Sequence, residues 1–175
     1  LIPEQAALGV AQIVITSGNG ETSRGELQLM KSSPAIFTVS YTGRGLPVAL
    51  TTFDGASYDS VANADGSARL VNPGSTWRPN YLLLFGTGLR NANGIKVRIG
   101  ATEITPMYVG AQGSFAGLDQ INVMLPANMP GGTTDVTVIT QGRASNTVQL
   151  KVAGEAVPSQ NSLTEDDVRR IISQA

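Results

Sequence analysis

Acidic side chains are the residues of this sequence with the clearest potential for chemistry. Asp54, Asp59, Asn63 and Asp65 fall within one short stretch, and loop carboxylates and amides are the ligands that Ca²⁺ prefers. The spacing matches no EF-hand loop, however, and Asp and Asn favour turns because they hydrogen-bond their own backbone. We therefore expect turn-forming roles here, with a calcium site at Asp54, Asp59 and Asp65 as the alternative.

Three further acids, Glu103, Asp119 and Asp135, raise the possibility of paired carboxylates of the glycosidase type. Nothing in their spacing brings two of them into one cleft. We expect scattered surface acids.

Other chemistries are excluded by residue type. The 175 residues contain no Cys and no His, so thiolate sites, histidine triads and imidazole ligands cannot form. The formal net charge is -1 and only 14% of residues are charged, which gives no electrostatic footprint for nucleic-acid binding. The segment Gly86-Thr87-Gly88 lacks the lysine of a phosphate loop and predicts a tight turn. We expect no catalytic residue, no resident metal and no cofactor.

Aromatic residues offer a different kind of site. Trp77 and Tyr108, with Tyr81 and Phe115, could form a platform for carbohydrate. We expect instead that Tyr108 and Phe115 pack the loop that leads into the FAGLDQINV strand, with sugar binding as the alternative. The candidate ligand-binding residues of such a platform are Trp77 and Tyr108.

The elements that position these residues are predicted to be short strands. Apolar and polar residues alternate through Glu26–Met30, Ile95–Ile99, Gln120–Leu125 and Thr147–Val152, as expected of half-buried antiparallel strands. Tyr81–Phe85 is apolar on both faces and predicts a central strand. It is the longest apolar run and is too short to cross a membrane. Gly and Pro clusters separate these runs, which predicts an all-β protein built as a β-sandwich.

An internal repeat organises the chain. Residues 1–30 align with residues 124–151: Gly9 matches Gly132, Gly20 matches Gly142, and Ser23 matches Ser145. The repeat predicts that residues 1–31 are the final strands of a first, incomplete sandwich, and that residues 73–153 form a complete second one. A lone hairpin is marginal in water, so the first fragment must pack on something.

The remaining segments have distinct compositions. Residues 32–72 are predicted to be a β connector with strands of its own, and residues 154–161 a polar linker. The sequence from Ser162 to Ala175 begins with a capping box and carries an apolar stripe, which predicts a short C-terminal helix.

Several motifs occur together in the second half: FGTGL (85–89), YVG (108–110), FAGLDQINVMLP (115–126) and SNTV (145–148), preceded by SPAIFTVSYTGRG (33–45). Over about residues 33–152 the chain resembles the C-terminal domain of uncharacterised extracellular proteins of Acidobacteria such as Solibacter. That family is in turn similar to the IPT/TIG immunoglobulin-like fold. The resemblance implies an immunoglobulin-like sandwich in a secreted or surface protein, and it brings no catalytic residue. The tail SLTEDDVRRIISQA more distantly resembles the first helix of α/β domains of haem-utilisation and glycolate-cluster proteins.

These features lead us to expect a non-catalytic structural or interaction module that is extracellular or on the cell surface, and serves as spacer, adhesion or filament element. Its partners would be proteins, including further copies of itself through strand complementation, without nucleic acid and without membrane insertion. Two alternatives stay open. One is a module that binds carbohydrate or a matrix ligand, and the other is the accessory stalk of a larger enzyme or haem-binding protein.

Overall fold

A computed structural model describes residues 2–3, 5–140 and 142–154. The described chain is all-β, as the sequence predicts, and contains no helix. The predicted C-terminal helix and all of the polar linker beyond Gly154 lie outside the described residues. The strands are β1 (Gly9–Thr16), β2 (Thr22–Leu29), β3 (Ala35–Ile36), β4 (Ala49–Thr52), β5 (Asp59–Ser60), β6 (Leu70–Val71), β7 (Tyr81–Thr87), β8 (Lys96–Ile99), β9 (Thr102–Ile104), β10 (Tyr108–Ala111), β11 (Asp119–Met124), β12 (Gly132–Thr140), β13 (Arg143–Ala144) and β14 (Val148–Val152).

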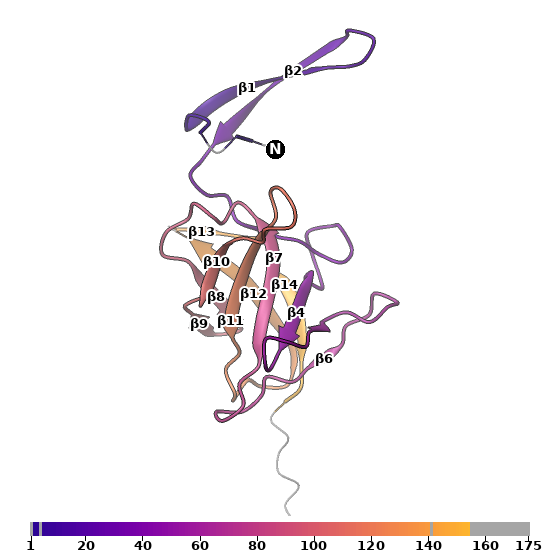
Figure 1. Ribbon diagram of the computed structural model, residues 1–175, viewed down its shortest axis with the longest axis vertical. Helices are drawn as coiled ribbons and strands as arrows, with labels where there is room; N and C mark the ends of the chain where they lie inside the picture. The colour runs from indigo at the N-terminus through magenta and orange to yellow at the C-terminus, as the bar shows by residue number, and fades with distance from the viewer. Residues whose placement is uncertain (1, 4, 141, 155–175) are drawn as a thin grey trace, which may run out of the picture.

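Twelve of these strands form two six-stranded sheets that make up the body of the molecule (Figure 1). One sheet has the order β10-β11-β7-β4-β5, and β3 pairs with the C-terminal end of β7. The other has the order β6-β14-β12-β8-β9, and β13 pairs with the end of β12. Neighbouring strands are antiparallel except β6 and β14, which run parallel.

One hydrophobic core joins the two sheets. It takes Leu82 and Leu84 from β7, Ile121 and Val123 from β11, and the alternate residues of β8, β12 and β14 from the opposite sheet. The predicted alternation is confirmed, because the apolar phase of 95–99, 120–125 and 147–152 is buried throughout. The prediction of a central strand at 81–85 is also confirmed: Leu82, Leu83 and Leu84 are all buried, and β7 pairs with strands on both sides.

The segment 32–72 contributes strands to both sheets of the body. β3, β4 and β5 belong to the first sheet and β6 to the second, so the two sheets draw on residues 35–152. Ile36, Ala49, Val61 and Val71 enter the core. The prediction that residues 73–153 alone would complete the sandwich therefore omitted four strands. Two-residue strands such as 70–71 are too short to show periodicity in sequence.

The FGTGL segment has a packing role. Phe85, Gly86 and Thr87 lie within β7, so the predicted tight turn at 86–88 is wrong, and the chain leaves the strand only at Gly88. A Cβ added to Gly86 would lie 2.2 Å from the carbonyl oxygen of Ala35, and one added to Gly88 would lie 2.1 Å from that of Ser33. Gly88 also has a φ of 74°, which favours glycine. The two glycines therefore let the 33–36 segment lie directly against the end of β7.

β1 and β2 form a separate two-stranded hairpin that projects from one end of the body (Figure 1). None of its residues belongs to the hydrophobic core. The chain enters the body through the segment after Met30, where the Ser32 and Thr140 hydroxyls lie 3.1 Å apart and the Ser33 amide donates to the Gly88 carbonyl over 3.1 Å. The hairpin is thus attached at its base and stands clear of both sheets.

Candidate functional site

The hairpin has two chemically different faces, fixed by its register. Gly9 pairs with Leu29 and Thr16 with Thr22, so cross-strand partners share a face. We call one the apolar face; it contains no charged residue. The other, the mixed face, carries both charges of the two strands. The apolar face consists of Gly9, Ala11, Ile13, Ile15, Ser23, Gly25, Leu27 and Leu29, and the mixed face of Val10, Gln12, Val14, Thr16, Thr22, Arg24, Glu26 and Gln28.

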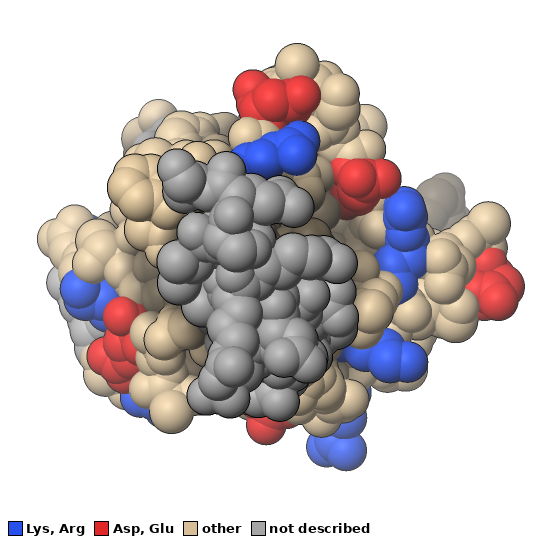
Figure 2. All heavy atoms as spheres, turned by 90° about the horizontal axis from the view of Figure 1, so that it is seen from below, with Lys and Arg blue, Asp and Glu red and all other residues tan. Residues whose placement is uncertain are grey.

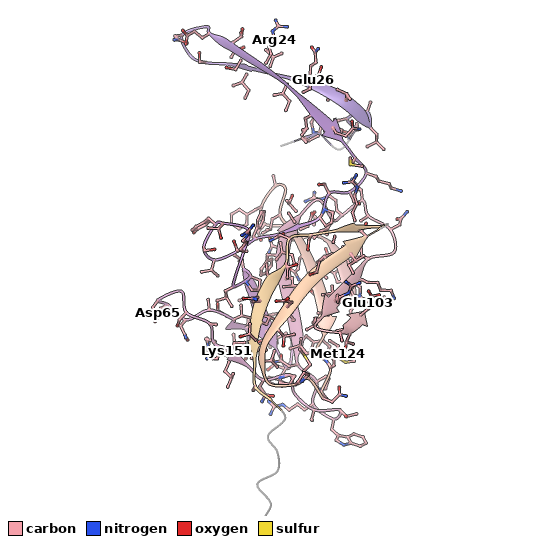
Figure 3. All side chains as sticks on the ribbon, turned by 180° about the vertical axis from the view of Figure 1, so that it is seen from behind. Arg24, Glu26, Asp65, Glu103, Met124 and Lys151 are labelled. Carbon is pink, nitrogen blue, oxygen red and sulfur yellow. The ribbon has the colours of Figure 1, made fainter. Side chains whose placement is uncertain are left out.

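The apolar face is open to solvent. Ile13 is 41% exposed, Ile15 65% and Leu27 38%. The sequence predicted that the apolar phase of β2 would be buried, but Leu27 is exposed and Leu29, next to the body, is only half-buried. Arg24 and Glu26 of the mixed face point away from the body (Figure 3), so the apolar face is turned toward the end of the body without being covered by it.

The equivalent strand pair in the body shows what such a face normally meets. Gly132 begins β12 as Gly9 begins β1, and their φ values are 115° and 120°. Gly142 and Gly20 follow these strands with φ values of 79° and 87°. The residues aligned with Ile13 and Ile15 are Val136 and Val138, which are fully buried against the opposite sheet. The aligned glycines therefore share a backbone conformation, and the two strand pairs differ in that one apolar face is covered and the other is not.

A shallow apolar groove of about 610 Å³ lies along β3 and the segment that joins it to β4. Phe37, Tyr41 and Val48 line it, and Tyr41 is almost fully exposed with a φ of 59°. Asn146 also lines it. The Asn146 Oδ1 accepts from the Ile36 amide over 2.8 Å, and its Nδ2 donates to the carbonyls of Ile36 and Gly43 over 3.0 and 2.8 Å. The sequence reasoning missed this amide, although the SNTV motif contains it.

A second, smaller pocket of about 100 Å³ lies beside β4 and β6. Its wall includes Asn80, which is 2% exposed. The Asn80 Nδ2 donates to the Asn72 carbonyl over 2.7 Å, which fixes the orientation of the amide, and its Oδ1 has no hydrogen-bond partner among the described residues. The volume suits a few water molecules or one small polar group.

Each predicted calcium ligand has hydrogen-bond or ion-pair partners of its own. The Asp54 carboxylate accepts from the amides of Ala56 and Ser57, each over 2.8 Å, and these hydrogen bonds lower the pKa of Asp54 below 3.8. Asp59 forms an ion pair with Arg69 at 3.3 Å.

Asp65 lies on a projecting loop (Figure 3). It accepts from the Ser67 hydroxyl and amide over 2.6 and 2.9 Å, which lowers the pKa of Asp65. Asp54 and Asp65 thus have the expected turn-forming roles, and the described residues contain no cluster of three acids able to hold a metal ion.

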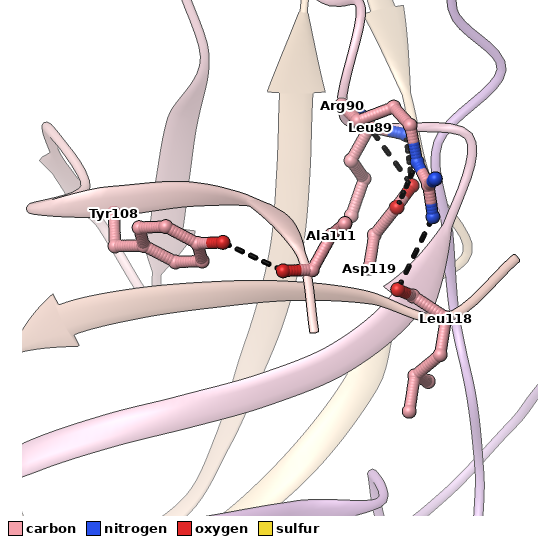
Figure 4. A network of polar contacts seen from close by, with 6 residues as sticks. All are labelled: Leu89, Arg90, Tyr108, Ala111, Leu118 and Asp119. Atoms are coloured by element: carbon pink, nitrogen blue, oxygen red, sulfur yellow. Dashed lines mark hydrogen bonds and ion pairs between the residues drawn. The ribbon is translucent and has the colours of Figure 1, made fainter. Parts of the chain in front are cut away.

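Trp77 and Tyr108 lie on different elements. Trp77 is 95% exposed in the turn that precedes β7. Tyr108 begins the edge strand β10, and its hydroxyl donates to the Ala111 carbonyl over 2.6 Å, across Gly110 (Figure 4). The expectation that both aromatic side chains pack the loop leading into β11 holds for Tyr108, which lies over Gly110 just before that loop, and is wrong for Phe115, which is 71% exposed.

Asp119 is not the surface acid that the sequence suggested. It is 1% exposed, and its carboxylate accepts from the Leu89 amide over 2.8 Å and from the Arg90 Nε over 2.7 Å. Arg90 also donates to the Leu118 carbonyl over 3.3 Å (Figure 4). This network ties the residues that follow β7 to the start of β11. The other two acids do lie at the surface: Glu103 pairs with Arg98, and Asp135 accepts from Gln149.

Charge is dispersed on the face opposite the hairpin. Lysine and arginine side chains alternate with acids around its visible part, without a patch of one sign (Figure 2). No helix among the described residues is long and apolar enough to span a membrane.

The chain matches no known family model, no curated protein and no solved structure.

Proposed function

We propose that this chain is a non-catalytic structural or interaction module of a secreted or cell-surface bacterial protein, and that it assembles through the apolar face of the β1–β2 hairpin. The observation that carries the proposal is the contrast between the two parts of the molecule. The body has a closed core of its own, whereas the hairpin holds Ile13, Ile15 and Leu27 in solvent. A two-stranded hairpin with an open apolar face is marginal alone and gains stability when another sheet covers it.

We further propose that the body is an immunoglobulin-like sandwich. Two mainly antiparallel sheets that bury alternate residues between them are typical of immunoglobulin-like sandwiches, and the resemblance to IPT/TIG domains agrees with this. The matching φ values of Gly9 and Gly132 support the view that residues 1–31 are the final strands of a first, incomplete sandwich of this kind.

A non-catalytic role is supported by how the polar residues are used. Asp119 is neutralised by Arg90 and a backbone amide, Glu103 by Arg98, and Asp54 and Asp65 cap turns. These carboxylates stabilise the structure locally and do not converge on one cleft.

The experiment compares two neighbouring residues of β1. Fluorescently labelled chain is titrated onto the envelope fraction of the cells that produce it, with Ile13→Lys on the apolar face and Val14→Lys on the mixed face as the matched control. We expect wild type and Val14→Lys to bind alike and Ile13→Lys to bind at least about tenfold more weakly, equivalent to about 1.4 kcal/mol. Equal binding by all three, or no binding by any, would contradict the proposal.

A second candidate function is binding of carbohydrate or a matrix ligand at the Trp77 end of the body. A nearly fully exposed tryptophan is unusual, and the neighbouring Arg78 guanidinium lies 4.9 Å from the centre of the Phe53 ring, which lines the pocket of Asn80. Trp77 is the one tryptophan of the sequence. Its fluorescence should therefore shift on titration of the wild-type chain with a glycan that binds. Calorimetry, which needs no tryptophan, should show that Trp77→Phe with Asn80→Ala abolishes binding. A glycan panel that leaves the fluorescence unchanged would eliminate this candidate.

A further inference from the structure

The apolar face of the hairpin has a regular arrangement of large and small side chains. Each cross-strand pair on this face joins one large residue to one small one. In the half nearest the body the large residues are on β2, and in the half nearest the turn they are on β1. The pairs are Leu29 with Gly9, Leu27 with Ala11, Ile13 with Gly25, and Ile15 with Ser23.

This arrangement is self-complementary. When two such faces are stacked about a two-fold axis that runs across the strands, Ala11 lies opposite the partner's Ile13 and Leu27 opposite the partner's Gly25. A two-fold axis along the strands instead places Ile13 opposite the partner's Gly25. In both cases every large side chain meets a small one, which is how two sheet faces interdigitate at a spacing of about 10 Å.

We propose that the apolar face packs against the same face of a second copy of this chain, in a two-fold symmetric dimer. The inference rests on the proposed assembly role of the hairpin and names its partner. Closed two-fold interfaces use one patch twice and require it to fit itself, and this face meets that requirement in shape. The apolar face also carries no charge that a copy of itself would repel, because the charged residues Arg24 and Glu26 lie on the mixed face.

The other apolar sheet faces of the chain are not available as partners. The inner faces of both body sheets are closed against each other, as Leu82 and Val97 show with 0% exposure. The groove at Phe37 and Val48 is open, but it is a groove at the sheet end and not a flat face with alternating residues. Among the described residues, a second hairpin is the surface whose pattern fits.

The size of the face sets the strength of the dimer. Two eight-residue strands present a face of roughly 26 by 10 Å, which is well below the ~800 Å² per partner of a standard stable interface. We therefore expect a reversible dimer that forms with rising concentration, not a permanent one.

Sedimentation velocity over a wide concentration range tests the inference. Wild type and Val14→Lys should dimerise with the same constant, and Ile13→Lys should raise the dissociation constant at least about tenfold. Ala11→Leu is the sharper variant, because it adds apolar surface but fills a small position. Overpacking of this kind costs about 1–3 kcal/mol, so Ala11→Leu should also weaken the dimer about tenfold or more, while Gln12→Leu on the mixed face should not.

The dimer is also tested on the wild-type chain, because that result does not depend on whether a variant keeps the hairpin folded. In a sample mixing isotopically labelled and unlabelled chains, intermolecular NOEs should join the Ile13 methyl groups to Ala11 or Gly25. A chain that is monomeric at every concentration would overturn the inference, and so would a dimer that Ala11→Leu strengthens, since that indicates unspecific adhesion. A monomeric chain that still binds the envelope fraction through Ile13 would refute the second copy and leave the proposed function standing.

Discussion

The Asp119 carboxylate lies 2.7 Å from the Arg90 Nε, and the acid is buried while the Arg90 side chain is 35% exposed. The Leu89 amide donates to the same carboxylate over 2.8 Å. One acid thus satisfies both a cation and the backbone of the turn after β7. It joins two sequence motifs separated by about thirty residues.

We expect Asp119→Ala to lower the free energy of unfolding by about 2–3 kcal/mol. Breaking a buried ion pair costs about 3–5 kcal/mol, and we discount this because Arg90 reaches solvent. The matched control is Glu103→Ala, which breaks the exposed pair with Arg98 and should cost about 1 kcal/mol or less. Urea unfolding of both variants measures the difference, and equal losses would argue against a structural role for Asp119.

Gly86→Ala should destabilise the body by about 2 kcal/mol or more, because a Cβ at this position meets the Ala35 carbonyl oxygen at 2.2 Å and the backbone must move. Gly18 in the hairpin turn has open space around it, so Gly18→Ala is the control and should change little. The comparison is made by thermal unfolding followed by circular dichroism. A Gly86→Ala variant as stable as wild type would show that the 33–36 segment is not held against β7.

Asn146 bonds to the backbone of two residues more than one hundred positions away. Asn146→Ala leaves the Ile36 amide and the carbonyls of Ile36 and Gly43 without these partners. At about 1 kcal/mol for each lost hydrogen bond, we expect a loss of about 2–3 kcal/mol and faster amide exchange at Ile36. The control is Gln149→Ala, whose side chain bonds the exposed Asp135. Unchanged exchange at Ile36 would refute the role.

The sequence predicted best where side chains alternate over four or more residues. The strands at 96–99, 119–124 and 148–152 bury the expected phase, because a strand with one covered face must alternate. It predicted least where structure depends on distant partners. Nothing local to Asp119 indicates that Arg90 will neutralise it, and nothing local to Asn146 indicates Ile36. The hairpin shows both: the repeat predicted its two strands and the alternation of 26–30 predicted the apolar phase of β2, but neither predicted that Leu27 would be exposed.

The turn held by Asp54 should depend on pH. Hydrogen bonds from Ser57 and Ala56 favour the carboxylate and lower its folded-state pKa below the ordinary 3.8. Its contribution is therefore present above that value and is lost as pH falls through the folded-state pKa. The amide shifts of Ala56 and Ser57, followed by NMR during acidification below about pH 3.8, should report this loss. In Asp54→Asn the same amides should not titrate, and a titration that survives the substitution would assign it to another group.

Removal of the hairpin should leave the body intact. Because no residue of β1 or β2 belongs to the core, a chain beginning at Lys31 should keep its free energy of unfolding within about 0.5 kcal/mol, as for changes away from packed features. The repeat supplies the matched control: removing β13 and β14, the counterpart of β2, takes Val148, Leu150 and Val152 out of the core and should abolish cooperative unfolding. The shortened chain should also be monomeric at all concentrations in sedimentation velocity. Together these results would assign the stability of the fold to the body and self-association to the hairpin. A body that loses more than about 2 kcal/mol with the hairpin would instead place the apolar face of that hairpin against the body in solution.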